Sequence, residues 1–343
     1  MRDRIQLPCH DRLEATSHPE SSGNGCRGGL KRSLRDELAV EPGFGSCYTT
    51  PMGSVFSTCR CCGHASSRTR SPHTLPHRLV YRITDGADAL VARCFQRCER
   101  CRSLYLPDEV FNALEVDYAT QDTQRFLAQE EARKKSALKL ARFIHARVPF
   151  PRRRLLEVGC AGGYFLEASR SLGAIVSGIE PSKDLTSFAS SLLGMDIVNC
   201  HLHEATLPNE SYGMVVMLDV LEHLDDPVSA IKQAFQWLEP NGWLVLLTPI
   251  ADSMASRFLG ARWWSRLPSH PVIFSRQRLF EALQDAQFSV KWHRWQPRFL
   301  PLGQVVMHLK NVVGLRYGGA RDHGLHANLR VNAFDQMLLL AQK

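Results

Sequence analysis

Two pairs of cysteines in the first third of the chain have the spacing of a metal site. Cys59 pairs with Cys62 and Cys98 pairs with Cys101, with two residues between the thiols of each pair. This spacing places two sulfurs on one tight turn, and two such turns supply the four ligands of a tetrahedral Zn²⁺ ion. We therefore predict one structural zinc ion bound by these four cysteines.

Other arrangements of the cysteines stay open. Cys61 and Cys94 are close enough in the sequence to replace one of the four ligands. Buried thiols without a metal are an alternative, and a disulfide framework or a redox-active Cys-x-x-C has less support. Between the two pairs, the dipeptide Asp85-Gly86 is a turn signal and predicts a β-hairpin over residues 77–95.

A second group of residues suited to chemistry follows a short apolar run. Glu157 lies near the end of this run, and Gly159, Gly162 and Gly163 follow within six positions. Glycines there allow the backbone to approach a ligand closely and to begin a helix without Cβ clashes. The next apolar run ends at Glu180, where a carboxylate can accept hydrogen bonds from both hydroxyl groups of a ribose. This order indicates a nucleoside-binding site; the alternative is a mere strand-to-helix turn.

These residues need a framework that brings the ends of strands together. From about residue 115, short apolar runs of β type alternate with segments of helical period. Near-continuous apolar strands between helices indicate a parallel sheet that is covered on both faces. We predict a doubly wound, mostly parallel α/β sheet of seven strands, in which the last strand runs in either direction. Ligands of such folds bind beyond the carboxyl ends of the strands.

Composition divides the chain into three parts. Residues 1–51 are rich in Ser, Gly and Pro, show no sustained period and are predicted to be disordered. Residues 52–110 form the predicted zinc-binding module, and residues 115–343 form the large domain. The net charge is +8, 44% of the residues are hydrophobic, and no apolar run has the length of a membrane span. The first residues lack the apolar core of a signal peptide, which predicts the cytoplasm.

Taken together, the motifs resemble those of class I S-adenosylmethionine-dependent methyltransferases. LLEVGCAGGYF is similar to their first motif, GIEPS to the motif of their second strand, and LDVLEHLDDP to the segment after their fourth strand. The cysteine pairs resemble the N-terminal zinc-binding module of some members. The resemblance implies S-adenosylmethionine as cofactor, bound by Glu157, Gly159, Cys160, Ala161, Gly163, Glu180, Leu202 and Asp219.

The resemblance also implies roles for these residues. Glu157 would orient the methionine part of the cofactor, the glycine loop would pack against it, and Glu180 would hold the ribose. Many relatives carry an acidic residue near the adenine, whereas this chain has His201 followed by Leu202. The backbone of Leu202 is therefore the expected adenine contact.

Two histidines are the candidate general bases for an oxygen or carbon nucleophile. His223 lies in DVLEH, and His270 lies in LPSHPVIFS, which resembles a segment beside the substrate in many relatives. A titrating imidazole predicts a limb of the pH–rate profile near pH 6 to 7, about the ordinary pKa of histidine. A structural role explains either histidine equally well. Trp263, Trp264 and residues 294–330 are predicted to roof the acceptor pocket; a place in the core explains the aromatic residues equally well.

Asp219, Glu222 and His223 resemble the set that binds a divalent ion in ubiquinone-pathway O-methyltransferases, and their spacing would place them on one helical face. The sequence thus predicts a methyltransferase that acts on oxygen or carbon of a sugar, a lipid-like compound or a secondary metabolite. The alternatives are an RNA methyltransferase with a basic zinc module and a non-catalytic cofactor-binding protein. Nucleic acid is disfavoured because LDVL, not Asn-Pro-Pro-aromatic, follows the fourth strand. Nothing in the pattern indicates an oligomeric state.

Overall fold

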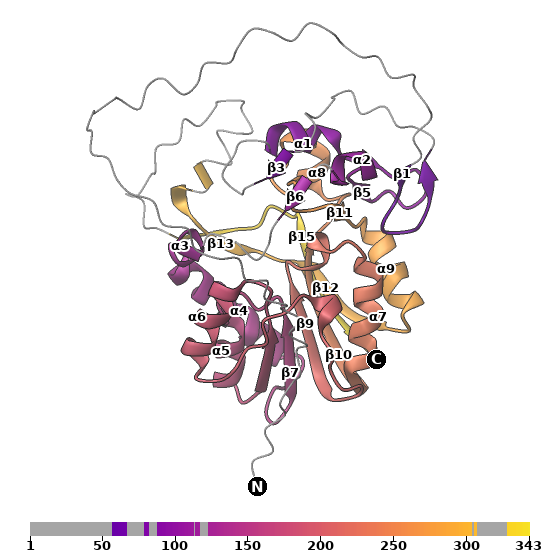
Figure 1. The fold of residues 1–343 in the computed structure, drawn as a ribbon. Coiled ribbons are helices and arrows are strands. Elements are labelled where there is room, and N and C mark those ends of the chain that lie inside the picture. Colours follow the sequence, from indigo (N-terminus) through magenta and orange to yellow (C-terminus); the bar gives the residue numbers. More distant parts are fainter. Residues whose placement is uncertain are drawn as a thin grey trace, which may run out of the picture. The chain divides into compact units, whose positions relative to one another are not determined.

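A six-stranded sheet lies at the centre of the fold, with the strand order β12-β15-β10-β9-β7-β8 (Figure 1). The structure is a computed structural model that describes residues 57–66, 79–81, 88–112, 114–116, 123–303, 305–306 and 328–343. The segment predicted to be disordered, 1–51, and Asp85-Gly86 lie outside the described residues. The strands of the sheet are β7 (Arg154–Val158), β8 (Ile175–Ile179), β9 (Tyr212–Leu218), β10 (Leu238–Pro249), β12 (Ser289–Trp295) and β15 (Gln336–Gln342).

The direction in which the sheet is wound reverses between β7 and β9. Strands β8, β7, β9 and β10 run parallel, with β8 on one side of β7 and β9 on the other. The last strand, β15, runs antiparallel between β10 and β12, a direction that the sequence left open. At the place of the predicted seventh strand, the chain forms only an isolated parallel bridge between Ile179 and Val198. The predicted doubly wound sheet is confirmed, with six paired strands and one bridge.

Helices cover both faces of the sheet. Helices α4, α5 and α6 pack on one face, where Leu155 of β7 and Met214 of β9 are buried (Figure 1). Helices α7 and α9 pack on the opposite face, against Leu156 and Val215. Successive strand residues thus face opposite layers, which explains the near-continuous apolar runs. The helices are α4 (Glu130–His145), α5 (Tyr164–Ser171), α6 (Lys183–Leu193), α7 (Pro227–Trp237) and α9 (Arg276–Asp285).

The sequence explains where several helices begin and end. Ser182 caps the start of α6 with its side chain, and Gly194, with a φ of 59°, ends the helix. Asp226 caps the start of α7 in the same way. A turn at residues 128–129 separates α3 (Thr123–Leu127) from α4. In the part of the chain that the structure describes, no helix is both long and apolar enough to cross a membrane.

The cysteine pairs lie in a module of short strands and helices. The β-hairpin predicted over residues 77–95 is wrong in its second arm, because residues 88–94 form helix α1. The helical period places Val91 and Cys94 in one buried cluster with Trp263. The elements of the module are β1 (Ser57–Thr58), β2 (Ala65–Ser66), β3 (Leu79–Tyr81), α1 (Asp88–Cys94), β4 (Gln96–Arg97), β5 (Leu104–Tyr105), α2 (Asp108–Asn112) and β6 (Leu114–Val116).

The cysteine module and the large domain share a small antiparallel sheet. Strand β11 of the large domain pairs with β5, which in turn pairs with β4. The backbone N–H of Leu106 adds a hydrogen bond to the carbonyl of Pro271 at 2.8 Å. Further elements of the large domain are α8 (Met254–Leu259), β11 (Val272–Ile273), β13 (Arg298–Pro301), β14 (Asn328–Val331) and the 3-10 helices Leu202–Glu204, Leu221–His223 and Gly260–Arg262.

Candidate functional site

The loop that follows β7 has a backbone conformation that favours small residues. Gly159, Ala161 and Gly163 have φ angles of 65°, 46° and 77°, all in the left-handed region. A Cβ atom on Gly159 would lie 2.9 Å from Cγ2 of Val220, in the segment after β9. The loop therefore lies tightly against the end of β9, where the winding of the sheet reverses and ligands of such folds bind.

Glu157 presents a buried carboxylate at the start of this loop. Its Oε2 is buried and has no hydrogen-bond partner among the described residues. Burial, and then the nearby Glu180, raise the pKa of Glu157 well above its usual range. A cationic group against Oε2 would satisfy this oxygen and stabilise its charged form. The site therefore fits the amino group of S-adenosylmethionine.

Glu180 connects the glycine loop to the turn after β8. Its Oε2 accepts a hydrogen bond from the backbone N–H of Ala161 at 2.8 Å, and its Oε1 accepts one from Ser182 at 2.9 Å. Burial raises the pKa of this carboxyl, and the two N–H groups oppose that effect. Each carboxylate oxygen has a second lone pair, which leaves room for ribose hydroxyl groups. The motif alone did not predict that Glu180 also holds the loop.

The other predicted cofactor residues lie along the same edge of the sheet. The Sγ of Cys160 lies 2.8 Å from where a Cβ atom of Gly178 would stand, so this side chain faces the sheet. Its backbone N–H donates to Ile179 and its carbonyl accepts from Gly163, which fixes the loop. Leu202 is half-buried at the start of its 3-10 helix. Asp219 is exposed directly after β9, has a φ of 55° and accepts a hydrogen bond from the side-chain amide of Gln336.

Two histidines lie beside each other close to the segment after β9. Nδ1 of His223 is 2.7 Å from the carbonyl oxygen of Ser269, and Nδ1 of His270 is 2.8 Å from that of Ser265. A carbonyl oxygen only accepts, so each Nδ1 carries the hydrogen and each Nε2 has a lone pair. The two ring centroids are 4.5 Å apart. Nε2 atoms in this state can accept a proton or bind a metal ion.

Burial keeps both imidazoles neutral. It lowers the pKa of His223 to about 4. It also lowers the pKa of His270 well below its usual range, and the neighbouring His223 adds to this effect. With pKa values lowered in this way, we no longer expect a limb of the pH–rate profile near pH 6 to 7.

The residues that could bind a divalent ion in the structure differ from the three that the sequence suggested. The 3-10 helix is a single turn, and Asp219 precedes it with a left-handed backbone, so the three predicted ligands do not share a helical face. Instead, Glu222, His223 and His270 bring their ligand atoms within 4.8 Å of one another. His270 therefore takes the place of Asp219 in this arrangement. The sequence did not reveal it, since His270 comes from a distant segment.

The structure brings the four predicted cysteine sulfurs together. The Sγ atoms of Cys59 and Cys101 are 3.7 Å apart, and those of Cys62 and Cys98 are 3.6 Å apart. All four lie within 4.8 Å of one another. Zn–S bonds of about 2.3 Å in a tetrahedron separate the sulfurs by about 3.8 Å, so these distances fit a zinc ion. Neither of the alternative ligands, Cys61 and Cys94, belongs to this group.

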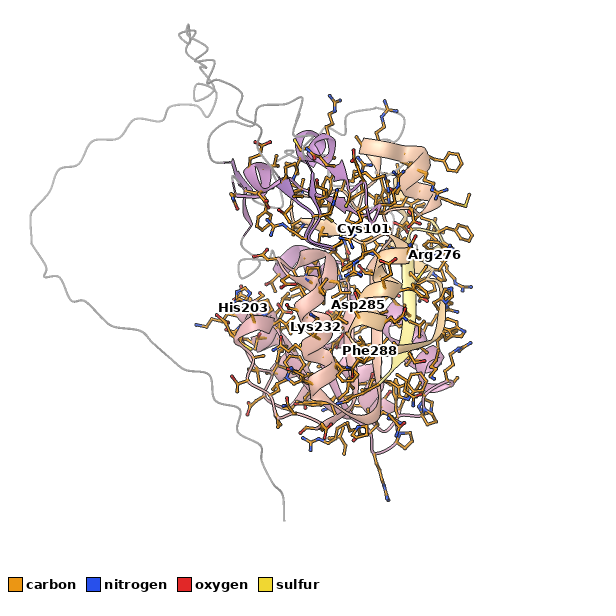
Figure 2. The ribbon with its side chains drawn as sticks, turned by 90° about the vertical axis from the view of Figure 1, so that its right-hand side faces the viewer. Cys101, His203, Lys232, Arg276, Asp285 and Phe288 are labelled. Carbon is orange, nitrogen blue, oxygen red and sulfur yellow. The ribbon has the colours of Figure 1, made fainter. Side chains whose placement is uncertain are left out.

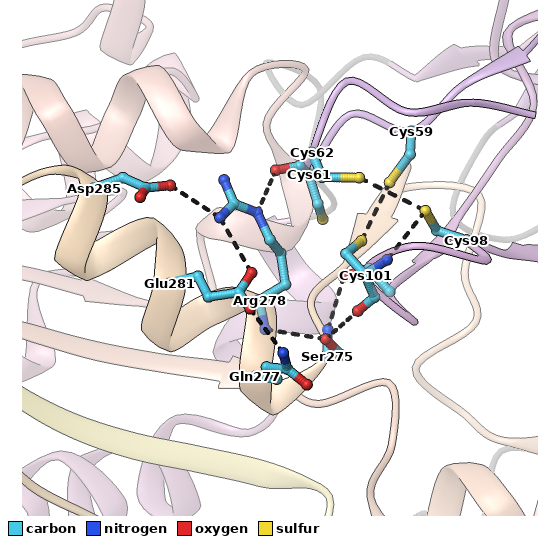
Figure 3. Close-up of polar contacts among 11 residues, drawn as sticks. Cys59, Cys61, Cys62, Cys98, Cys101, Ser275, Gln277, Arg278, Glu281 and Asp285 are labelled. Atoms are coloured by element: carbon cyan, nitrogen blue, oxygen red, sulfur yellow. Dashed lines mark hydrogen bonds and ion pairs between the residues drawn. The ribbon is translucent and has the colours of Figure 1, made fainter.

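Helix α9 of the large domain holds the cysteine turns in place (Figure 3). Nε of Arg278 donates to the carbonyl oxygen of Cys61 at 2.8 Å, and its Nη1 is paired with acidic side chains of the same helix. Ser275, which caps α9, donates from Oγ to the carbonyl oxygen of Cys101 at 2.5 Å. Figure 2 shows Cys101 near the end of α9 that carries Arg276. Sequence reasoning missed these contacts, whose partners are 174 and 217 residues apart.

The large domain is similar to known methyltransferases. Residues 122–291 match the model of a methyltransferase domain family. The ubiquinone biosynthesis O-methyltransferase of Thiobacillus denitrificans is 30% identical over 114 residues, which are 31% of this chain and 49% of that protein. The protein of the same name from Xanthomonas campestris pv. campestris is 33% identical over 135 residues, 36% of this chain and 56% of that protein. The chain spans about half the length of these relatives.

A solved S-adenosylmethionine dependent methyltransferase from Mesorhizobium loti is 17% identical, with a TM-score of 0.42, and covers 58% of this chain and 95% of that chain. The sheet order and the glycine loop are those of a doubly wound α/β domain that binds ligands beyond the strand ends. With the family match, residues 122–291 are a methyltransferase domain whose motifs are of the class I S-adenosylmethionine-dependent type. The prediction from the motifs is confirmed at this level.

Proposed function

We propose that this chain transfers a methyl group from S-adenosylmethionine to a hydroxyl oxygen of a small-molecule acceptor. The observation that carries the proposal is the place of His270, a neutral imidazole next to the segment after β9. That segment begins with Asp219 and contacts the glycine loop through Val220. A base therefore stands at the same end of the sheet as the expected cofactor site.

The residues of the chain act by positioning and by moving one proton. When bound, S-adenosylmethionine supplies a methyl group that its sulfonium already activates for displacement. Glu157 holds the amino group and Glu180 holds the ribose, which fixes the direction of transfer. Nε2 of His270 accepts the proton of the acceptor hydroxyl as its oxygen forms the new bond to carbon.

The named relatives favour oxygen over carbon as the acceptor atom. Both are ubiquinone biosynthesis O-methyltransferases, and their names imply a small-molecule acceptor. Sugars, lipid-like compounds and secondary metabolites that carry a hydroxyl group are the classes we propose. RNA remains the competing substrate in the test below.

A divalent cation is the alternative use of the same histidines. Glu222, His223 and His270 have a geometry that a metal ion fits, and a cation there would lower the pKa of an acceptor hydroxyl directly. Turnover that a chelator removes and Mg²⁺ or Mn²⁺ restores, with the zinc content unchanged, would favour this version. Turnover that survives the chelator favours His270 as the base.

We further propose that residues 52–110 form a zinc-binding module in front of a methyltransferase domain over residues 115–343. The four sulfurs at zinc spacing support a structural ion bound by Cys59, Cys62, Cys98 and Cys101. A centre of four thiolates needs reduced cysteines, which favours a reducing compartment such as the cytoplasm. Metal analysis of the purified full chain should give about one zinc ion per chain.

The test of the proposed function is transfer of labelled methyl groups from S-adenosylmethionine. The full chain is incubated with a panel of catechols, sugars and hydroxylated lipids, and in parallel with total RNA. We expect label on a hydroxyl oxygen of a small acceptor. Label on RNA would reverse the ranking of the two substrates, and tight cofactor binding without any transfer would support a non-catalytic protein.

A further inference from the structure

The buried carboxylate of Asp335 interacts with the donor groups of three side chains that are distant from it in the sequence. Its Oδ2 accepts hydrogen bonds from Nε1 of Trp264 at 2.7 Å and from Nε1 of Trp263 at 3.4 Å. Nη2 of Arg298 lies 3.5 Å from the same oxygen. Asp335 is only 2% exposed, so its charge is held by these donors and not by bulk water.

The partners of Asp335 lie near His270, on the side of the site that we call the acceptor side because it carries the proposed base. Trp263 and Trp264 stand shortly before His270 in the chain, and Arg298 lies on β13, above the sheet (Figure 1). Arg298 is also close enough to act on the charges of Asp219 and His270. Asp335 therefore fixes Trp264 and Arg298 beside the segment of His270, while Trp263 is buried in the core next to them.

The residue after Asp335 contacts Asp219, on the cofactor side of the same site. Gln336, the first residue of β15, is buried and donates a hydrogen bond to Oδ1 of Asp219. Strand β15 is itself held by the pairing of Gln336 with Pro249 at the end of β10. Asp335 and Gln336, at the start of β15, thus hold the acceptor side and the cofactor side in a fixed relation.

We propose that Asp335 is a positioning residue that shapes the acceptor pocket through Trp264 and Arg298, and that it governs acceptor binding without touching the cofactor. This inference rests on the proposed function. It predicts that loss of the carboxylate raises the KM for the acceptor, whereas the affinity for S-adenosylmethionine stays the same because Gln336 still holds Asp219.

The experiment compares Asp335→Asn with the wild type, using the acceptor of the panel that gives the highest turnover. We expect the KM for the acceptor to rise at least about tenfold, which corresponds to about 1.4 kcal/mol. The Kd for S-adenosylmethionine, measured by calorimetry, should stay within about twofold. Tryptophan emission should shift, because the indole of Trp264 loses its charged acceptor. Trp264→Phe, which removes the N–H donor together with part of the ring, should also raise the KM.

Glu210→Gln is the matched control, since it removes one carboxylate charge from an exposed side chain just before β9, at the end of that strand opposite to Asp219. Its KM should equal that of the wild type. An unchanged acceptor KM in both Asp335→Asn and Trp264→Phe would overturn the proposal. So would a parallel loss of acceptor and cofactor binding in both, since that marks general unfolding. If the wild type transfers no methyl group to any acceptor, the proposed function falls first, and this inference falls with it.

Discussion

The cofactor side and the acceptor side of the candidate site are assembled in different ways. The glycine loop and Glu180 of the cofactor side belong to one βαβ unit, in which Glu180 binds the backbone of Ala161 and of Ser182. The acceptor side combines His270 and Asp335 with other segments from distant parts of the chain. Contacts that close long loops cost more chain entropy than local contacts. The acceptor side therefore forms only when the whole domain is folded.

In the contacts described above, the cysteine centre contacts only the acceptor side. The turn of Cys101 binds Ser275, and β5 pairs with β11, the strand that follows His270 by two residues. Leu106 binds the carbonyl of Pro271, the direct neighbour of His270. Loss of the centre should therefore disturb the acceptor side far more than the cofactor side, which makes the comparison testable.

The largest effect is expected from Cys98→Ser. This variant should lose the bound zinc, about one ion per chain, and most of its methyl transfer, because β5 no longer holds the segment around His270. Cofactor affinity should stay close to that of the wild type, as measured by calorimetry. Cys94→Ser, which removes a buried cysteine outside the centre, should keep the metal. Full retention of zinc in a Cys59→Ser, Cys98→Ser double variant would reject the centre.

The second effect concerns the proposed base. In His270→Gln, turnover should fall roughly 10²-fold or more, the usual contribution of general base catalysis. The Kd for S-adenosylmethionine should not change, since His270 belongs to the acceptor side. Steady-state kinetics and calorimetry on the same preparation separate the two quantities. Full turnover would leave the methyltransferase standing and remove its proposed base.

A smaller effect is expected on the cofactor side. Glu180→Ala removes a carboxylate that we expect to bind the ribose, and charge-assisted hydrogen bonds contribute about 1.5–3 kcal/mol each. Affinity for S-adenosylmethionine should fall at least about tenfold. Glu210→Ala, a change to an exposed acid beside Lys343, should leave the affinity unchanged. Equal affinity in Glu180→Ala would place the ribose elsewhere.

The contrast between contacts that are local in the sequence and contacts that are distant explains what the sequence could predict. The glycine loop and the cysteine pairs are visible because their residues are neighbours in the chain and their spacing reflects one turn. The bond between Asp335 and Trp264 spans 71 residues, and that between His223 and Ser269 spans 46, so no local period encodes them. Helix α1 was mistaken for a hairpin arm because its burial against Trp263 is decided by tertiary contacts.

The histidine pKa values could not be predicted either, since they depend on burial. His223 has a pKa of about 4 in the folded chain, whereas an unfolded histidine has about 6.5. The unfolded state thus binds the proton more tightly. The stability that comes from a neutral His223 is complete above about pH 6.5 and is lost as the pH falls toward 4.

The smallest predicted effect follows from this shift. The wild type should lose thermal stability between about pH 6.5 and pH 4, and His223→Gln should show a weaker dependence over the same interval. Melting temperatures measured across this range give the comparison, with His203→Gln, an exposed histidine, as the matched control. The rate of methyl transfer should likewise show no histidine limb between pH 6 and 7. A limb in that range that disappears in His270→Gln would mean that His270 is hydrated in solution, and the acceptor side would then be more open than the packing around Ser265 and Ser269 implies.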